Sequence, residues 1–533
     1  MRNACSHPFH RRIASHKYDT WLSPGDYRPL PKGWHQTRET HCSSSTFIPS
    51  TSGSNIHELT LQVVRDPLQM KPYSGHSHDR RKIDGYPFTD MFMSTTNVLL
   101  ALSLVYAANA QCTPHGSLAF RSPVTVAQGL SATPLSANLT TPRGITIDSL
   151  QNILVIERGV GVTAFTDQDT SCDGWLRSIV VQNADLTQGI QVDGGSLYVS
   201  TAGEVLRYPY NPATRTSTGS PTTLISGIPP DGELTTRPVL LHPSVNPSVI
   251  LVSSALATNI DPTARDPSSG RSQVRSFRLK PSGPAQDFFA GNLVAFGIRN
   301  PAGFAFLPPD QTSHIWVVDN GASIDNVTGL TTAFVNDNPA DELSLVKDPL
   351  SGSSSLNRFY GFPDCTTLWN PLADPTGNPE FTKLRTGDQF SLRLEADRDD
   401  AWCRNVTNNV PPRLSFQAHS VPLDLKFFFP SKKSLPRSLP HVWSGDAFVS
   451  FHGSFNRVPP TGYGVVRVPF ANSRPIASRF SNSGYSFLVQ ATNLNTCPGT
   501  CIRPVGLVFS SDGRLFVTSD SSGELFVVSS AEH

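Results

Sequence analysis

A short unit built from two strands and a polar turn recurs along the sequence and limits the folds that the chain can adopt. Each copy begins with glycine, continues as a short strand with alternating apolar residues, and reaches a β-branched or aromatic strand after the turn. The copies span residues 144–165, 189–210, 303–322 and 506–528. Such alternation between turns indicates antiparallel meanders. Because the unit repeats along most of the chain, we predict radially packed sheets, an all-β fold of the β-propeller type.

Two further strand-like runs, Val249–Ser254 and Asp446–Phe470, bring the expected number of blades to six. A tandem of β-sandwiches is the alternative, but it would not place a glycine-led strand pair at the start of each repeat. Two long stretches, residues 323–342 and 351–411, interrupt the pattern. Long loops are usually functional, and on a propeller we expect them over one face, around the central axis, where a ligand can bind.

The balance of charges excludes a global electrostatic field for polyanions. The chain holds 43 lysine and arginine residues against 42 aspartate and glutamate residues, a net charge of +1. Nucleic acids and anionic membranes are attracted by a net positive surface, so we expect neither as a partner. Charged residues make up only 16% of the chain, and proline is frequent, with 45 residues. Long charged surface helices are therefore not expected.

Residues 91–110, MFMSTTNVLLALSLVYAANA, are typical of a secretory signal peptide. They carry no charge and end in the small-x-small pattern Ala108-Asn109-Ala110, which predicts cleavage before Gln111. The apolar run is shorter than the roughly 20 residues that a membrane span needs, so we expect no span after cleavage. Residues 1–90 show no sustained apolar period. We interpret them as a disordered extension or as no part of the natural protein, and residues 111–533 as the propeller.

Cysteines and sequons agree with an oxidising, extracellular location. Six of the eight cysteines follow the signal segment, and they are Cys112, Cys172, Cys365, Cys403, Cys497 and Cys501. This number after a signal peptide predicts three disulfides. Pairing of sequence neighbours (112–172, 365–403, 497–501) is one of several possible connectivities. Three Asn-x-Ser/Thr triplets, at Asn138, Asn326 and Asn405, also fit a secreted protein.

Several longer strings resemble a known family. They are GIRNPAGFAF (297–306), NDNPADELSLV (336–346), NRFYGFPDC (357–365), QAHSVPLDLKFF (417–428), GDAFVSFHGSFNRVPPTGYGVVRVPF (445–470) and CPGTCIRPVGLVF (497–509). Together they are similar to the soluble quinoprotein glucose/sorbosone dehydrogenase family, and most closely to its fungal pyranose dehydrogenases. The resemblance spans nearly all of residues 112–530. It implies a six-bladed propeller that binds pyrroloquinoline quinone (PQQ) and Ca²⁺ on its axis and oxidises sugars by hydride transfer.

The resemblance also implies a set of cofactor contacts. PQQ carries carboxylates and an ortho-quinone, so its site needs several cations and a divalent ion. The residues that the resemblance places near the cofactor are Arg299, Asn300, Lys426, Arg457 and Arg503. Arg237, in the segment GELTTRP, and Tyr360, in FYGFPDC, are further candidates, and Arg143 is expected there because TPRG precedes a strand at another axis-facing loop. For a single arginine such as Arg143 the alternative is a solvated surface charge. Tyr360 and Phe362 either stack on the flat quinone or pack in a blade core.

By the same resemblance, a Ca²⁺ site is expected around two segments. Calcium binds six to eight oxygens and commonly mixes carboxylates with backbone carbonyls. The expected ligands are the Asn320 and Asp341 side chains and the Gly321 and Ala322 carbonyls. Ordinary turn chemistry is the alternative explanation for these residue types.

The sequence departs from the family pattern where the catalytic base is expected. Fungal members usually show a Gly-His-Thr-Thr-Arg-Thr-like segment, but residues 232–238 read GELTTRP, so Leu234 occupies the histidine position. A second family histidine, in an Asn-His-Gly string, is replaced by Gln188. Neither side chain can act as a general base. Of the remaining histidines, His419 and His452 lie inside cofactor motifs, and we predict His419 as the base.

The resulting functional prediction is a secreted, PQQ- and Ca²⁺-dependent dehydrogenase of pyranose sugars (sorbosone- or glucosone-like aldoses). It would pass electrons to an external acceptor, either a cytochrome-type protein or a small quinone. One alternative is a catalytically degenerate propeller that binds PQQ or sugar without turnover, which Leu234 and Gln188 favour. The other is a lactonase-type propeller hydrolase, which also uses a central Ca²⁺. The expected arginine and lysine contacts argue against a lactonase, because an uncharged lactone needs no cluster of cations to bind it.

Overall fold

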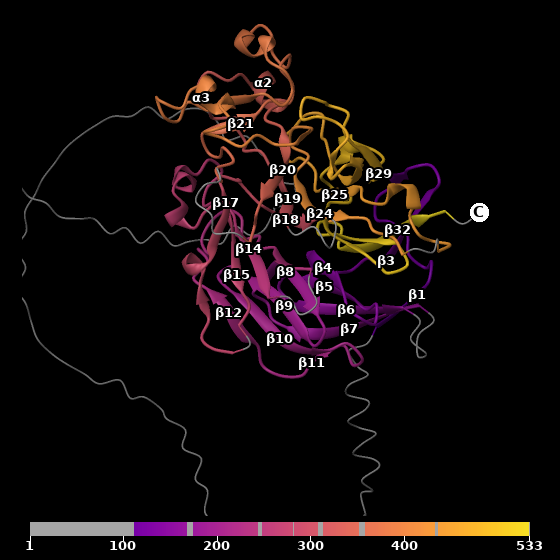
Figure 1. The fold of residues 1–533 in the computed structure, drawn as a ribbon. Coiled ribbons are helices and arrows are strands. Elements are labelled where there is room, and N and C mark those ends of the chain that lie inside the picture. The colour runs from indigo at the N-terminus through magenta and orange to yellow at the C-terminus, as the bar shows by residue number, and fades with distance from the viewer. Residues whose placement is uncertain are drawn as a thin grey trace, which may run out of the picture. The chain divides into compact units, whose positions relative to one another are not determined.

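Six sheets, antiparallel except for one parallel pair (β12 with β16), form the body of the protein, so the prediction of a six-bladed β-propeller is confirmed (Figure 1). The computed structural model describes residues 111–167, 174–243, 248–280, 282–307, 313–350, 358–431 and 435–531. The predicted extension at 1–90 and the predicted signal peptide at 91–110 lie outside the described residues. Within the described part of the chain, no helix is long and apolar enough to cross a membrane.

The first three blades follow one another along the chain, each starting from its innermost strand, except that blade one also takes the early strand β1 and blade two takes β16 from within the segment of blade three. Blade one consists of β4 (Pro142–Ile147), β5 (Ile153–Glu157), β6 (Gly161–Asp167), β7 (Gly174–Gln182) and β1 (Gln111–Pro114). Blade two consists of β8 (Leu186–Asp193), β9 (Ser196–Thr201), β10 (Val205–Asn211), β11 (Thr216–Ser217), β12 (Thr222–Ser226) and β16 (Gln286–Asp287). Blade three consists of β13 (Val239–Leu241), β14 (Val249–Ser254), β15 (Gln273–Arg278) and β17 (Asn292–Phe296).

The last three blades continue the same order, but the final two also take a strand from the beginning of the described chain. Blade four consists of β18 (Gly303–Phe306), β19 (His314–Asp319), β20 (Asp341–Lys347) and β23 (Leu414–Phe416). Blade five consists of β24 (Pro422–Phe427), β25 (Ala447–Phe451), β26 (Gly464–Val468), β29 (Ser486–Ala491) and β2 (Val124–Val126). Blade six consists of β30 (Pro504–Phe509), β31 (Leu515–Ser519), β32 (Glu524–Ser530) and β3 (Leu130–Ser136).

The propeller is closed by strands far apart in sequence. Strand β3 pairs antiparallel with β32, so Leu130 lies opposite Ser530, and the two strands run together in Figure 1. Strand β2 pairs in the same way with β29. Both pairings complete a blade whose other strands come from the C-terminal part of the chain. The ring therefore holds itself together through main-chain hydrogen bonds.

Alternation along each strand explains why the blades pack face to face. In β19, Ile315 and Val317 belong to one buried cluster, whereas Trp316 and Val318 belong to another. Successive strand residues point to opposite faces, so each blade contributes to the core on both sides. Burial of such a side chain stabilises the fold by about 1.5–3 kcal/mol. This two-sided burial is why strands such as β5 and β25 are apolar at nearly every position.

The two long stretches outside the repeat contain more structure than the sequence indicated. They hold α2 (Thr332–Asn336), η4 (Pro379–Lys383), α3 (Asp400–Arg404) and the small sheet β21 (Cys365–Thr367)–β22 (Gln389–Ser391). We refer to these two stretches together as the insertion. Phe334, Phe381 and Phe390 lie in its apolar core, and the ring centroids of Phe334 and Phe381 are 4.3 Å apart. The expectation of irregular loops is wrong here, because these aromatic residues build a small core of their own.

Short elements and disulfides complete the described chain. The remaining elements are η1 (Pro262–Arg265), η2 (Pro267–Ser269), η3 (Phe288–Ala290), η5 (His441–Trp443), η6 (Leu494–Thr496) and the pair β27 (Phe470–Ala471)–β28 (Arg474–Pro475). Disulfides join Cys365 to Cys403 and Cys497 to Cys501, as predicted. The third predicted pair involves Cys172, which lies outside the described residues.

Candidate active site

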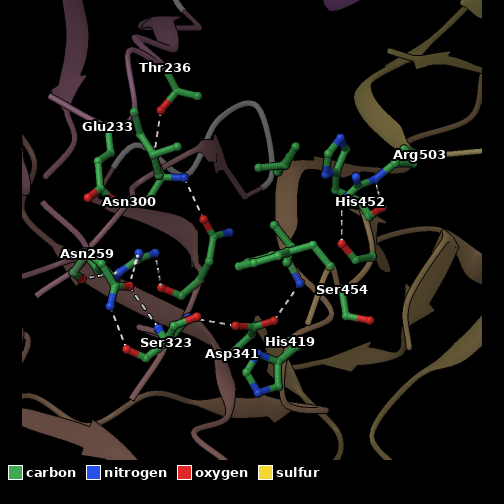
Figure 2. A pocket seen from close by; sticks show the side chains of 18 of the residues that line it. Glu233, Thr236, Asn259, Asn300, Ser323, Asp341, His419, His452, Ser454 and Arg503 are labelled. Carbon is green, nitrogen blue, oxygen red and sulfur yellow. Dashed lines mark hydrogen bonds between the residues drawn. The ribbon is translucent and has the colours of Figure 1, made fainter. Parts of the chain in front are cut away.

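A cavity of about 830 Å³ lies where loops and strand ends of all six blades converge (Figure 2). One lining residue from each blade in turn illustrates this convergence: Arg143, Gln188, Asn259, Asn320, His452 and Arg503. Since every blade contributes, the cavity lies on the propeller axis, the place expected from the sequence. Eight of the predicted site residues line it, namely Arg143, Arg299, Asn300, Asn320, Gly321, Asp341, His419 and Arg503.

Arg143 is fixed by two side chains at the wall of the cavity. Its Nη1 donates to Oδ2 of Asp520 at 2.6 Å, and its Nη2 donates to Oε1 of Gln188 at 2.7 Å. Its Nε is buried and makes no hydrogen bond among the described residues. Arg503 is oriented differently, because its Nε and Nη2 donate to the backbone carbonyls of His452 and Gly453. Two guanidinium groups are thereby held in fixed orientations at one side of the cavity.

Arg299 and Asn300 are positioned by the end of β19. The carboxylate of Asp319 accepts hydrogen bonds from both of their backbone N–H groups, at 2.8 and 2.7 Å. The Arg299 guanidinium donates through Nη2 to Oδ1 of Asn259 at 2.9 Å. Burial lowers the pKa of Arg299 and raises the pKa of Asp319 to about 6. The arginine is consequently a rigid, desolvated cation at the cavity wall.

Asp341 is a buried carboxylate in the same cavity. Its Oδ1 accepts the Gly321 N–H at 2.7 Å, and its Oδ2 accepts the Val421 N–H at 2.6 Å (Figure 2). Burial raises the pKa of Asp341 to about 7, and the charge of Asp319 adds to the rise. Each carboxylate oxygen keeps a second lone pair for a further partner. Such a desolvated carboxylate favours a cation beside it.

Of the other expected Ca²⁺ ligands, Asn320 faces the cavity and Ala322 does not. The Asn320 amide accepts from Asn300 through Oδ1 and donates to the Pro422 carbonyl, both at 2.6 Å. Ala322, by contrast, packs in the apolar core of the insertion and does not line the main cavity. Within the described residues, no three histidine, cysteine, aspartate or glutamate side chains come together as metal ligands. A cation here would therefore need amide, backbone and ligand oxygens beside Asp341, a mixture that Ca²⁺ accepts.

Leu234 and Gln188, the two residues at which the resemblance predicts histidines, both line the cavity. Gln188 donates from Nε2 to the Ala302 carbonyl at 2.9 Å. Two histidines line it as well. His419 has Nε2 at 3.0 Å from the carbonyl of Val335, whereas Nε2 of His452 lies 2.8 Å from Oδ1 of Asp520. The cavity thus contains two imidazoles, those of His419 and His452.

Three of the predicted cofactor contacts point elsewhere. Arg237 is fully buried and donates to the backbone carbonyls of Ala202, Pro229, Leu234 and Thr236. Tyr360 packs in a blade core and donates to the Leu345 carbonyl at 3.0 Å. Lys426 pairs with Asp424 two residues earlier on β24, at 2.7 Å. None of the three lines the cavity.

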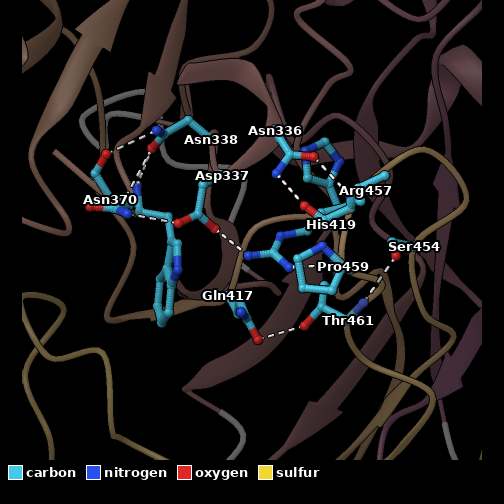
Figure 3. Close-up of polar contacts among 12 residues, drawn as sticks. Asn336, Asp337, Asn338, Asn370, Gln417, His419, Ser454, Arg457, Pro459 and Thr461 are labelled. Carbon is cyan, nitrogen blue, oxygen red and sulfur yellow. Dashed lines mark hydrogen bonds and ion pairs between the residues drawn. The ribbon is translucent and has the colours of Figure 1, made fainter. Parts of the chain in front are cut away.

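Arg457 also lies outside the cavity lining, and it joins two loops (Figure 3). Its Nη2 donates to Oδ1 of Asp337, which follows α2, and its Nη1 donates to the Pro459 carbonyl, both at 2.6 Å. Beside it, Asn336 and Val458 exchange two hydrogen bonds. The predicted cofactor cation is therefore a connection between the insertion and the loop that follows His452.

Several residues of the site were not predicted from the sequence. Asn259, Ser323, Ser454 and Glu233 line the cavity, and Asp520 holds both Arg143 and His452. The sequence did contain a pattern that could have identified Asp520 as a site residue. It directly follows β31, and the matching strand of another repeat, β19, ends in Asp319. Polar residues at equivalent ends of repeated strands meet at one end of a propeller.

Comparison with known proteins agrees with this geometry. The TrAA12-like family model matches residues 124–531. The chain is 35% identical over 430 residues to a PQQ-dependent sugar dehydrogenase of Hypocrea jecorina, covering 78% of this chain and 92% of that protein. It is 34% identical over 430 residues to a PQQ-dependent pyranose dehydrogenase of Coprinopsis cinerea, covering 76% of this chain but only 55% of that protein.

Solved structures show the same relationship. A calcium structure of the Trichoderma reesei carbohydrate-active enzymes family AA12 protein superposes with a TM-score of 0.69 at 33% identity, covering 79% of this chain and all of that chain. The holo form of the pyranose dehydrogenase PQQ domain from Coprinopsis cinerea gives 0.67 at 31% identity, with 79% and 100% coverage. Fold and site define a six-bladed propeller with an arginine-lined axial cavity. The chain belongs to the TrAA12-like family.

Proposed function

We propose that this protein is a PQQ- and Ca²⁺-dependent dehydrogenase that oxidises pyranose sugars. The observation that carries the proposal is one axial cavity that combines fixed guanidinium groups (Arg143, Arg299, Arg503) with the buried carboxylate of Asp341. Arginines bind planar carboxylates through paired hydrogen bonds, so the cavity suits a polycarboxylate cofactor. The names of the relatives from Hypocrea and Coprinopsis agree with PQQ as that cofactor.

The residues present also suit a hard cation next to the cofactor. Asp341 supplies a desolvated carboxylate, and Asn320 and Gly321 line the same part of the cavity. A Cβ added to Gly321 would come within 2.9 Å of the Ala340 carbonyl oxygen, so a side chain at this position would crowd the loop. When bound, the quinone would accept the hydride from the sugar carbon, and the cation would polarise a quinone oxygen.

The chain's own residues have three tasks in this scheme. The arginines would orient the cofactor, Asp341 would hold the cation, and a cavity histidine would take the proton of the sugar hydroxyl. His419 and His452 are the candidates for the last task, because both line the cavity. A positioned base contributes typically 10²–10⁴-fold to the rate.

Secretion and electron transfer belong to the same proposal. Asn138, Asn326 and Asn405 are all exposed, so each sequon is accessible to glycosylation. The described cysteines at 365, 403, 497 and 501 are paired, as is usual outside the cytosol. We propose an extracellular enzyme that passes electrons from the reduced cofactor to an external acceptor, a cytochrome-type protein or a small quinone.

Reconstitution of residues 111–533 tests the proposal. The purified protein is titrated with PQQ at saturating Ca²⁺ and in chelator, with cofactor binding followed by fluorescence quenching. Dye reduction is then measured with a panel of pyranoses. We expect tight binding only with Ca²⁺ and turnover with at least one aldose. Absence of PQQ binding with Ca²⁺ would reject the proposal.

A propeller that binds PQQ without turnover is the second candidate. It is supported by one observation, which is that Leu234 and Gln188 both line the cavity, and by the resemblance, which predicts histidines at these two positions. Binding of PQQ without dye reduction by any pyranose would support this candidate. A lactonase-type hydrolase is opposed by the guanidinium groups, since an uncharged lactone does not require them.

A further inference from the structure

His452 differs from the other cavity histidine in the group that holds it. Its Nε2 lies 2.8 Å from the carboxylate of Asp520, whereas Nε2 of His419 contacts only the uncharged carbonyl of Val335. A carboxylate fixes the tautomer with the proton on Nε2 and stabilises the imidazolium when Nδ1 takes a second proton. A carbonyl also fixes this tautomer, but it carries no net charge to stabilise the imidazolium. Nδ1 of His452 makes no hydrogen bond within the described part of the chain and is not sealed from solvent.

The charged groups around His452 come from several blades. Asp520 follows β31, Arg143 lies on β4, and Arg503 precedes β30. Arg143 binds the second oxygen of Asp520 at 2.6 Å, and Arg503 donates to the His452 carbonyl at 3.1 Å. His452 therefore faces two cations and one anion. Without a ligand, a further positive charge on the imidazole would be opposed by both guanidinium groups.

The titration of His452 follows from this arrangement. Burial lowers its pKa to about 4, and Arg503 contributes to the decrease, while Asp520 opposes it. An anion placed against the two guanidinium groups would offset their charge and raise the pKa towards its ordinary value. The cofactor of the proposed function is such an anion.

We infer that His452, held by Asp520, takes the proton of the sugar hydroxyl. It gains this ability when the anionic cofactor lies beside Arg143 and Arg503. The inference rests on the proposed function and deepens it, because it assigns the base that Leu234 cannot provide. It also places the base at a position different from His419, the residue predicted from the sequence.

The step balances without a further reagent. The O–H bond of the sugar hydroxyl breaks, and its proton goes to Nδ1 of His452. The C–H bond on the same carbon would break, and its hydrogen would leave with the electron pair as hydride to the bound quinone. The carbon–oxygen bond would become a carbonyl, so the two electrons lost by the sugar would pass to the cofactor. Asp520 stays ionised and balances the charge of the imidazolium.

The test measures proton uptake on cofactor binding, which does not depend on turnover. PQQ is titrated calorimetrically into the Ca²⁺-loaded protein near pH 5.5 in buffers of different ionisation enthalpy. We expect the wild type to take up close to one more proton per PQQ than His452→Asn, since pH 5.5 lies above the pKa of the free site. His115→Asn, at an exposed imidazole outside the cavity, serves as the matched control and should behave as the wild type.

Turnover gives the second measurement. With PQQ affinity unchanged within threefold, His452→Asn should lower kcat by about 10²-fold or more, while His419→Gln should lower it less. Equal proton uptake by wild type and His452→Asn would overturn the inference, and so would an unchanged kcat. If His452→Asn does not fold, Asp520→Asn replaces it and should likewise lose the proton uptake.

The outcomes separate this inference from the proposed function. A wild type that fails to bind PQQ in the presence of Ca²⁺ contradicts the proposed function itself. A wild type that binds PQQ and oxidises sugar equally well with and without His452 contradicts only the assignment of the base. A larger loss of kcat in His419→Gln than in His452→Asn would return the role to His419.

Discussion

Nη2 of Arg143 donates a 2.7 Å hydrogen bond to Oε1 of Gln188, so Gln188, at a position where the family resemblance predicts a histidine, holds a cavity arginine in place. The other end of the amide donates to the Ala302 carbonyl. Gln188→Leu would leave both partners unsatisfied in a buried place. We expect the free energy of unfolding to fall by about 1–3 kcal/mol, measured by urea denaturation. Gln286→Leu, whose hydrogen bond is exposed, should change it by less than about 0.5 kcal/mol.

Arg299→Ala should weaken PQQ binding by about 1.5–3 kcal/mol, the range for a hydrogen bond to a charged group. The reason is that Asn259 fixes this guanidinium at the cavity wall. Fluorescence titration with PQQ and Ca²⁺ measures the change. Arg278→Ala, at an exposed position of β15, provides the control. Equal affinities in both variants would make Arg299 a structural residue only.

Asp341→Asn should remove the stabilisation of the protein by Ca²⁺. A ligand present at 100 times its dissociation constant stabilises the native state by about 2.7 kcal/mol, so thermal unfolding of the wild type should shift upwards with Ca²⁺. The variant should show the same Tm with Ca²⁺ and with chelator. Asp193→Asn, on an exposed hairpin, should keep the full shift. A persistent shift in Asp341→Asn would place the ion elsewhere.

Arg237→Met should lower stability without altering cofactor affinity. The guanidinium donates to three backbone carbonyls of the segment around Leu234 and to the Ala202 carbonyl between β9 and β10, and those acceptors would lose their donor in a buried place. The expected loss is at least about 3 kcal/mol in the free energy of unfolding. PQQ affinity of the folded variant should stay within threefold of the wild type. A selective loss of PQQ affinity would instead make Arg237 a cofactor contact.

Leu234→His should restore turnover to a protein that lacks the base. Leu234 lines the cavity, and the resemblance predicts a histidine at this position, so a histidine there can approach the same substrate. In the His452→Asn background we expect kcat to rise by about tenfold or more in the dye-reduction assay. Leu234→Asn in the same background is the control. Equal kcat values for Leu234→His and Leu234→Asn would mean that the pocket has repacked around Leu234.

The fold was predictable because its signal is repeated. The units that begin at Gly144, Gly189, Gly303 and Gly506 coincide with strands of four different blades. The structure of the insertion was not predictable, because residues such as Phe334 and Phe390 are too far apart in the sequence to indicate that they share a small core. Only the three-dimensional arrangement shows it.

The site was predictable in part, for a related reason. A motif tells which segment approaches the axis but not which way each side chain points. Arg237 and Tyr360 lie in motif segments and turn towards backbone carbonyls or a blade core. For Lys426, the strand period of two places Asp424 on the same face, so their ion pair could have been expected. Asp520 could have been predicted only by comparing the strand ends of the repeats, because it lies in no motif.

The pairing of β3 with β32 and of β2 with β29 has a consequence for how the protein is made. During synthesis, the strands at 124–136 emerge early and must wait for partners nearly four hundred residues later along the chain. Until the ribosome has released those partners, two blades are incomplete and the edges of their strands are unprotected. Removal of residues 111–136 should therefore yield protein that aggregates on expression rather than a smaller stable domain.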